Sequence, residues 1–221
     1  MDRGLYRAAI RQPSFAALPL TPPPYNAAGA KCLDDLSLSF LRLGGESTHR
    51  QLQESVTNVE YKMSTGVLFV CLGNICRSPS AQGIFQKLVD DKGLGAEIHI
   101  DSCGTAPFNV GKPADPRAVA ACQRAGYDIS RLVARQVHDD DYLRFDYIIP
   151  MDHKNLSTLK GWMPKTFGGE LQLFMHYCDH GGMTQIPDPY YEDASKFDAV
   201  IRTLEKASNG LLAHIRKKHG I

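Results

Sequence analysis

The chain has 221 residues, with 25 lysines and arginines against 24 aspartates and glutamates, so its formal net charge is +1. This balance gives no support to a nucleic-acid-binding protein, which normally carries a basic excess. No apolar run approaches the ~18 residues of a membrane-spanning helix, so we expect no membrane span. The length and the 43% of hydrophobic residues fit one domain with an additional segment, or two small domains.

The chain changes in character near residue 62. Residues 1–62 contain 5 of the 13 prolines and little sustained periodicity, and we interpret them as a poorly structured N-terminal extension. Three explanations stay open: a misassigned start codon with Met63 as the true first residue, a disordered regulatory tail, or an organelle-targeting segment. Residues 63–221 are long enough to form a whole domain by themselves.

This second part alternates strands and helices. A continuous apolar run at 67–70 predicts a strand buried on both faces. Helical spacing of apolar residues follows, with Ser78 as the expected N-cap. Then come a strand over 97–101, a helix from Asp115 to Gly126, a strand over 145–150, a helix over 155–162, a possible strand over 171–174 and a C-terminal helix with apolar residues from 197 to 215. The alternation predicts a single doubly wound α/β domain with a four-stranded parallel sheet flanked by helices.

The loop between the first strand and its helix carries the clearest chemistry; it reads Cys71-Leu72-Gly73-Asn74-Ile75-Cys76-Arg77-Ser78. Such a loop turns backbone N–H groups inward, and the helix N-terminus adds roughly half a positive charge, so the site suits a phosphate. Gly73 would allow a close backbone approach and a positive φ, and Asn74 also tolerates the left-handed region. Arg77 can hold two phosphate oxygens with its planar fork. The nucleotide-binding P-loop pattern with its lysine is absent.

Two residues are candidates for covalent and acid–base chemistry. The helix terminus and Arg77 would favour the thiolate of Cys71, with Ser78 close enough to hydrogen-bond its sulfur. The alternative for Cys71 is a small buried hydrophobic residue. Asp188 lies between Pro187 and Pro189, which stiffen its backbone, so it is either a proton donor or part of a plain turn.

The segment from Val67 to Pro79 resembles the signature of the low-molecular-weight protein tyrosine phosphatases. The resemblance covers residues 63 to about 215, and residues 1–62 match nothing in it. Its other parts are Asp101-Ser102, Asp115-Pro116-Arg117, Ala134-Arg135-Gln136, Phe145-Asp146-Tyr147-Ile148, Met151-Asp152 and Asp188-Pro189-Tyr190-Tyr191.

The resemblance implies a metal-independent enzyme without a cofactor. It makes Cys71 the nucleophile that forms a phosphocysteine, Asp188 the general acid, and Arg77 the residue that stabilises the phosphoryl oxygens. It further implies that Ser102 supports the loop, that Phe108 and Tyr190 form aromatic pocket walls, and that the phosphate is bound by Leu72, Gly73, Asn74, Ile75, Cys76 and Ser78. The substrate would be a phosphotyrosine-containing protein and the product inorganic phosphate. Relatives that dephosphorylate arginine usually carry threonine at the position of Ile75, so this residue favours phosphotyrosine.

Two features qualify this resemblance. Leu132 stands where the family often has a histidine that helps to hold the loop asparagine. Cys71 and Cys76 could form a reversible disulfide, as in relatives, or Cys76 could be a neutral loop residue. The six cysteines form no C-x-x-C pair, and we expect cytosolic thiols in a cytoplasmic protein that is a monomer or a weak dimer.

Three other interpretations are weaker. An arsenate reductase would need resolving cysteines and a different loop near the acid, whereas Cys178 is the only cysteine after Cys122 and Asp188-Pro189-Tyr190-Tyr191 is intact. A non-catalytic phosphate-binding module would normally lack the nucleophile, the arginine or the acid. His176 and His180 have the i,i+4 spacing of a metal site, but Gly181 and Gly182 follow directly, which favours a surface turn.

Overall fold

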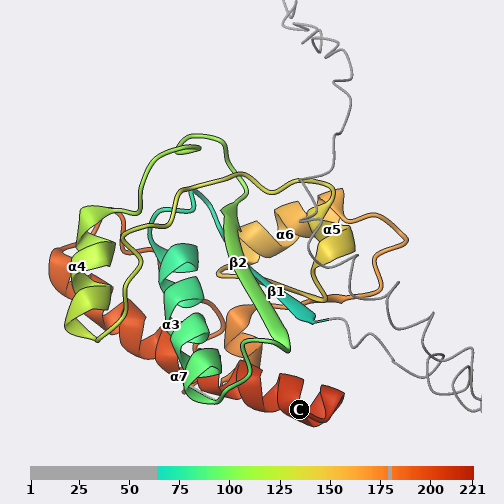
Figure 1. Ribbon diagram of the computed structural model, residues 1–221. Coiled ribbons are helices and arrows are strands. Elements are labelled where there is room, and N and C mark those ends of the chain that lie inside the picture. Colours follow the sequence, from blue (N-terminus) through green and yellow to red (C-terminus); the bar gives the residue numbers. More distant parts are fainter. Residues whose placement is uncertain (1–63, 179–180) are drawn as a thin grey trace, which may run out of the picture. The chain divides into compact units, whose positions relative to one another are not determined.

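The computed structural model describes residues 64–178 and 181–221. The expected N-terminal extension over 1–62 lies outside these residues. The described part is built on a four-stranded parallel sheet with the strand order β2-β1-β3-β4, and Figure 1 shows β1 and β2 side by side. The sheet confirms the predicted doubly wound α/β fold; its strands are β1 (Thr65–Cys71), β2 (Ile98–Gly104), β3 (Tyr147–Pro150) and β4 (Glu170–Leu171).

The central strand β1 brings the loop over 71–78, which we call the phosphate loop, to one edge of the sheet. All seven of its residues are buried. In the parallel register Cys71 pairs with Gly104 of β2, and Val70 pairs with Pro150 of β3. The carboxyl ends of three strands therefore lie at the same edge, which is where ligands bind in open α/β sheets.

Alternate residues of β1 face two separate cores. Val67 and Phe69 belong to the core under α3 (Arg77–Asp91), α4 (Pro116–Arg124) and α7 (Ala194–His219). Leu68 and Val70 belong to the core under α5 (Asp141–Arg144) and α6 (His153–Trp162). Helices thus cover both faces of the sheet (Figure 1), which is why this strand reads as a continuous apolar run.

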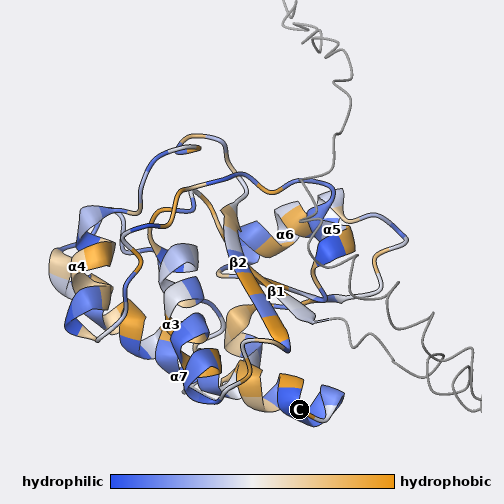
Figure 2. Ribbon diagram, viewed as in Figure 1, coloured by the Kyte–Doolittle hydropathy of each residue, from blue (hydrophilic) through white to orange (hydrophobic). Residues whose placement is uncertain are grey.

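The long helix α7 is amphipathic. Hydrophobic and hydrophilic residues alternate along it in Figure 2, and its buried residues run from Phe197 to Ile215. Three basic residues stand in its last turn together with His219, and Gly220 ends it in the left-handed conformation, as helix-dipole and C-cap preferences predict. In the part of the chain that is described, no helix is long and apolar enough to cross a membrane.

Some predicted boundaries are wrong. Helix α3 begins at Arg77 with Cys76 at the N-cap position, so Ser78 is not the cap. The fourth strand covers only Glu170–Leu171, and Phe174 instead begins the short 3-10 helix η1 (Phe174–Tyr177). Phe174 leaves the sheet because its ring packs 5.0 Å from that of Phe69 in the core. The four-residue helix α5 has no counterpart among the predicted elements.

Candidate active site

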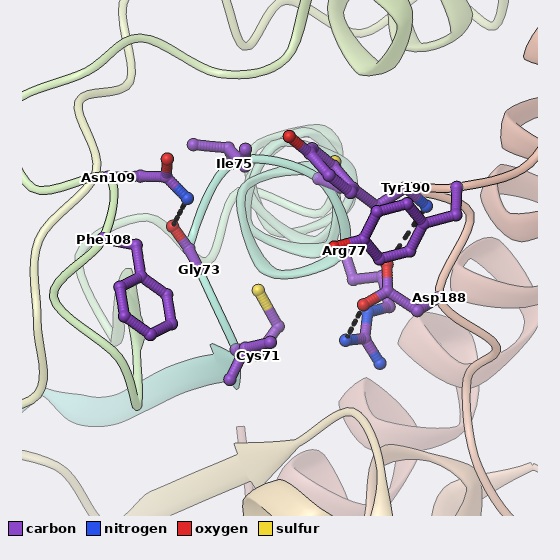
Figure 3. A pocket seen from close by; sticks show the side chains of 11 residues that line it. Cys71, Gly73, Ile75, Arg77, Phe108, Asn109, Asp188 and Tyr190 are labelled. Atoms are coloured by element: carbon purple, nitrogen blue, oxygen red, sulfur yellow. Dashed lines mark hydrogen bonds and ion pairs between the residues drawn. The ribbon is translucent and has the colours of Figure 1, made fainter.

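A cavity of about 230 Å³ opens at the carboxyl end of β1 (Figure 3). Its lining comes from three segments that are far apart in the sequence: the loop after β1, the loop after β2 and the loop before α7. The lining residues are Cys71, Leu72, Gly73, Ile75, Cys76, Arg77, Phe108, Asn109, Asp188, Tyr190 and Tyr191. Most of the predicted site residues are thus brought to one place, and the side chains of Asn74, Ser78 and Ser102 are not among those that line it.

Two hydrogen bonds meet at the sulfur of Cys71. The backbone N–H of Asn74 donates to Sγ at 3.2 Å, and the hydroxyl of Ser78 lies 3.1 Å from the same atom. The predicted contact of Ser78 with the sulfur is confirmed. Cys71 is only 3% exposed, so both contacts lie in a part of the site that is largely closed to water.

The loop backbone supplies a nest of donors. Within the described residues, the N–H groups of Gly73, Ile75 and Cys76 donate to no protein acceptor. The left-handed residue of the loop is Asn74, with φ 54°. It is one of the two residues for which the sequence allowed this conformation, and Gly73 does not adopt it. A Cβ on Gly73 would lie 2.6 Å from Nδ2 of Asn109, so the glycine leaves room for this amide to donate to its carbonyl at 3.3 Å.

Arg77 is fixed by two carboxylates. Nη1 donates to Asp152 at 2.7 Å and to the carbonyl of Ile186 at 3.3 Å, while Nη2 donates to Asp188 at 2.6 Å. Burial alone would lower the pKa of Arg77, but the negative charges of Cys71, Asp188 and Asp152 raise it above its ordinary value. The arginine therefore keeps its charge although its side chain is 3% exposed.

The loop before α7 holds the Asp188 carboxyl on the same side of the cavity as Arg77. The neighbouring Ile186 is fully buried, and its N–H donates to the carbonyl of Met151 at 2.8 Å. Oδ1 of Asp188 accepts the N–H of Tyr190 at 3.2 Å, and Oδ2 contacts Arg77. The carboxyl therefore borders the cavity that Cys71 lines.

Two aromatic rings flank the cavity. Phe108 and Tyr190 lie on opposite sides of Cys71 in Figure 3, and both are exposed at their outer faces. They come from the loop after β2 and from the loop that carries Asp188. The space between them suits a flat ring that enters phosphate first.

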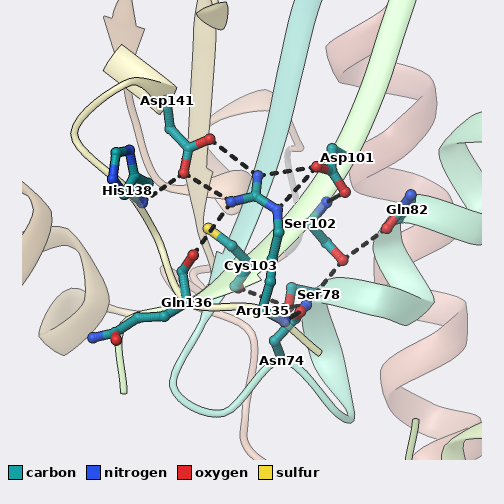
Figure 4. Close-up of polar contacts among 10 residues, drawn as sticks. All are labelled: Asn74, Ser78, Gln82, Asp101, Ser102, Cys103, Arg135, Gln136, His138 and Asp141. Carbon is teal, nitrogen blue, oxygen red and sulfur yellow. Dashed lines mark hydrogen bonds and ion pairs between the residues drawn. The ribbon is translucent and has the colours of Figure 1, made fainter. Parts of the chain in front are cut away.

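A polar network behind the loop holds Asn74 in its left-handed conformation (Figure 4). Its Nδ2 donates to the hydroxyls of Ser78 and Ser102, both at 2.9 Å, and its Oδ1 accepts the N–H of Arg135 at 2.9 Å. Ser102 in turn donates to Oε1 of Gln82 at 2.7 Å. The side chains of Asn74 and Ser78 are committed to this network and to the sulfur, and the part of these two residues in phosphate binding stays a prediction.

Arg135 fixes the far side of the network. Its guanidinium pairs with Asp101 at 3.0 Å and with the buried Asp141 at 2.9 Å. These ion pairs hold the segment whose N–H reaches Asn74. Together the contacts give the loop one conformation, in which its donors converge on the cavity.

The comparisons with known proteins agree with this geometry. A family model described as low molecular weight phosphotyrosine protein phosphatase matches residues 66–220. The low molecular weight phosphotyrosine protein phosphatase of Sus scrofa is 39% identical over 157 residues, which cover 70% of this chain and 98% of that protein. The chain belongs to this family. It is therefore a hydrolase of the protein-tyrosine-phosphatase class.

Solved structures show the same relationship. The protein tyrosine phosphatase from Entamoeba histolytica, described with Hepes in the active site, matches this phosphatase with a TM-score of 0.67 and 34% identity. The match covers 71% of this chain and 99% of that chain. A structure described as DARP, Drosophila arginine phosphatase, matches with a TM-score of 0.64 and 29% identity, over 68% of this chain and 97% of that one.

The second loop cysteine of the phosphatase differs from the first. Burial, followed by the nearby charge of Asp115, raises the pKa of Cys76 well above its ordinary value. Cys76 is therefore a neutral thiol at physiological pH. Both Cys71 and Cys76 are free in the structure, and a disulfide between them stays a prediction.

The two histidines with metal-site spacing, for which a surface turn was favoured, are not both described. His176 lies in η1 with its ring 5.2 Å from that of Tyr177, whereas His180 lies outside the described residues. Over 64–178 and 181–221, no three metal-ligating side chains gather into a cluster.

Sequence reasoning missed two functional neighbours of the phosphatase loop. Asp152 had no predicted role in the site; it caps α6, and it also anchors Arg77. Gln82 lies four residues after Ser78 and thus on the same face of α3, which is the signal that could have found it. Leu132 makes no polar contact and packs against the hydrophobic core.

Proposed function

We propose that this phosphatase hydrolyses phosphotyrosine in proteins by transferring the phosphoryl group to Cys71. One observation carries the proposal: the sulfur of Cys71, the unpaired loop N–H groups and Arg77 line one cavity, and the carboxyl of Asp188 borders it. The loop donors and Arg77 provide the charge neutralisation that phosphoryl transfer requires.

In the first step the sulfur of Cys71 attacks phosphorus in line with the leaving oxygen. The S–P bond forms as the bond from phosphorus to the tyrosine oxygen breaks, and Asp188 gives its proton to that oxygen. The phosphoryl oxygens take the place of Asp188 on Nη2 of Arg77, while Asp152 keeps Nη1 in position. The products of this step are tyrosine and a phosphocysteine.

In the second step water attacks the phosphocysteine. Asp188, now ionised, takes a proton from the water as the O–P bond forms and the S–P bond breaks. Inorganic phosphate leaves, and the thiolate of Cys71 is restored. The hydrogen bonds from Asn74 and Ser78 to the sulfur stabilise it as the leaving group.

The preferred substrate is phosphotyrosine, a phosphate ester, rather than phosphoarginine, a phosphoramidate. The relative described as an arginine phosphatase makes the second substrate a real alternative for this fold. Ile75 lines the cavity between the aromatic walls, and its apolar side chain suits a phenyl ring better than a guanidinium. Phosphoarginine hydrolysis faster than phosphotyrosine hydrolysis would reverse this assignment.

The cellular compartment of the enzyme can be inferred from its cysteines. Five described cysteines, Cys71 among them, are free, and a catalytic thiol needs a reducing compartment. We therefore place the phosphatase in the cytoplasm, acting as a monomer or a weak dimer. Size-exclusion chromatography with light scattering tests the state of assembly.

The direct test measures hydrolysis of p-nitrophenyl phosphate and of a phosphotyrosine peptide at about pH 6 in EDTA. Cys71→Ser abolishes both activities, because a hydroxyl is a far weaker nucleophile there. Asp188→Asn lowers peptide hydrolysis by about a hundredfold or more. It lowers p-nitrophenyl phosphate hydrolysis less, because nitrophenolate leaves without a proton. Equal losses on the two substrates would count against Asp188 as the acid.

A further inference from the structure

Arg117 connects the phosphate loop to the loop that carries Asp188. It is the second residue of α4, and the N-cap Asp115 accepts from it with both carboxylate oxygens, at 3.1 Å from Nε and 2.8 Å from Nη2. The hydrogen bond from Arg117 holds the pKa of Asp115 below its ordinary value. The N–H of Asp115 donates to the carbonyl of Ile75 at 2.8 Å, so this pair is attached to the phosphate loop.

Two aromatic rings contact the same guanidinium. Its central carbon lies 4.8 Å from the ring centroid of Phe197 and 5.5 Å from that of Tyr190, both within cation–π range. Phe197 is a buried core residue of α7, whereas Tyr190 is a wall of the cavity. Asp115 thus fixes the polar edge of the guanidinium, and Arg117 joins the exposed wall to the buried core.

Tyr190 needs such a support. It is 41% exposed, and its other aromatic neighbour is Tyr191, whose ring lies 4.9 Å away. Tyr191 is itself 93% exposed, so it cannot fix the position of the Tyr190 ring. The N–H of Tyr190 also donates to Asp188, so a displacement of Tyr190 would also displace the carboxyl of Asp188. Arg117 itself does not line the cavity.

We propose that Arg117 is a positioning residue that holds the Tyr190 ring as a wall of the substrate slot, and that it thereby sets affinity for the aryl group of the substrate. The inference rests on the proposed function of the site. The phosphate group is bound by the loop N–H groups and Arg77; Arg117 makes no hydrogen bond to either and reaches the loop only through Asp115. Loss of Arg117 therefore weakens binding of an aryl phosphate and leaves binding of inorganic phosphate unchanged.

The experiment compares two ligands as competitive inhibitors of p-nitrophenyl phosphate hydrolysis. Inorganic phosphate reports the phosphate loop alone, and benzylphosphonate reports the loop and the aromatic wall together. Arg117→Met is expected to weaken benzylphosphonate roughly threefold to tenfold and to leave inorganic phosphate within about twofold. Arg117→Lys keeps the charge but loses the planar fork, so it gives an intermediate loss.

Arg124→Met is the matched control. Arg124 also lies on α4 and also pairs with an aspartate, Asp198 at 2.7 Å, but far from the cavity lining. It should change neither inhibition constant. In a Tyr190→Leu background, Arg117→Met should no longer change benzylphosphonate binding, because the wall that it supports is gone.

The outcomes separate this inference from the proposed function. An intact enzyme that binds neither ligand contradicts the proposed function itself. An intact enzyme that binds both, with a ratio of inhibition constants that Arg117→Met and Arg117→Lys leave unchanged, overturns the role of Arg117. A lower melting temperature with an unchanged ratio likewise overturns it, because a purely structural role moves stability alone. If Arg117→Met does not fold, the ratio in Arg117→Lys decides.

Discussion

At the scale of single residues, the two carboxylates on Arg77 are not equivalent. Asp152 is 16% exposed in its side chain and also caps α6 through the N–H of Asn155. Asp188 is 41% exposed in its side chain and lies on a loop at the rim of the cavity. An arriving phosphate can therefore displace Asp188 from the guanidinium while Asp152 keeps the fork aimed at the cavity.

Gln82 supports the reaction through the network, and its removal should be measurable. Ser102 accepts a hydrogen bond from Asn74 and has one hydroxyl proton, which it gives to Gln82. Gln82→Met removes that acceptor at nearly constant volume. We expect kcat/KM for aryl phosphates to fall roughly two- to tenfold, the net value of one hydrogen bond. Gln82→Glu keeps an acceptor and should restore most of the activity.

The control for Gln82 is the same change one turn further along α3. Gln86 is half-buried, and its amide donates to Asp90. Gln86→Met should leave kcat/KM and the inhibition constant of inorganic phosphate unchanged. If Gln82→Met behaves in the same way, the network does not need this residue.

At the scale of elements, the sequence predicted what local patterns determine. The run at 67–70 predicted β1, and Asp115 with Gly126 predicted the two ends of α4, where Asp115 accepts from the N–H of Arg117. The sequence-based prediction misplaced the start of α3, because serine is a residue type that often caps helices. In the structure the hydroxyl of Ser78 instead contacts Cys71, Asn74 and the carbonyl of Cys103. Tertiary contacts there override the local preference.

The packing of α7 against η1 leads to a prediction about stability. A Cβ at Gly210 would collide with the carbonyl of Tyr177, so only glycine permits this approach. Gly210→Ala should lower the free energy of unfolding by about 2 kcal/mol. Urea denaturation followed by circular dichroism measures the change.

Gly161 provides the comparison for this substitution. It lies in α6, and a Cβ there meets nothing within 4 Å. Gly161→Ala should therefore stabilise the protein by up to about 1 kcal/mol, because alanine has the higher helix propensity. Destabilisation by both substitutions, or by neither, would contradict the close packing of α7 on η1.

At the scale of the whole molecule, the site joins segments that sequence spacing does not relate. The alternation of elements predicted the parallel sheet, and parallel strands bring their carboxyl ends together. The sequence motifs identified Cys71, Arg77 and Asp188 but did not predict how these residues are arranged in space. Contacts such as Arg77 with Asp152, or Gln82 with Ser102, depend on how α3, β2 and β3 pack, and single residue types carry no signal for them.

The opposite end of the sheet carries an acid-sensitive contact. Glu170 of β4 accepts from Tyr177 of η1 and pairs with Lys218 and His214 of α7. Burial would raise the pKa of Glu170, but these partners lower it overall. Because the folded pKa is depressed, this contribution to stability is present above the unfolded value of about 4.3 and is lost as pH falls through the folded pKa.

Glu170→Gln tests this contact. We expect its free energy of unfolding to be lower than that of the intact chain by about 1 kcal/mol near neutral pH, with the difference vanishing below about pH 3. Glu205→Gln is the control: Glu205 also accepts a tyrosine hydroxyl, from Tyr127, but makes no ion pair among the described residues. A difference for Glu170→Gln that does not change with pH would show that its charge is not involved.

The measurement that bears most directly on the mechanism is the capture of the intermediate. Asp188→Ala is mixed with a phosphotyrosine peptide, quenched in acid within the first turnover and digested for mass spectrometry. We predict one phosphoryl group on the proteolytic peptide that contains Cys71. In the double variant that carries both Asp188→Ala and Cys71→Ser we predict none. Turnover without a phosphorylated Cys71, or with the phosphoryl group on another residue, would contradict nucleophilic catalysis by this cysteine.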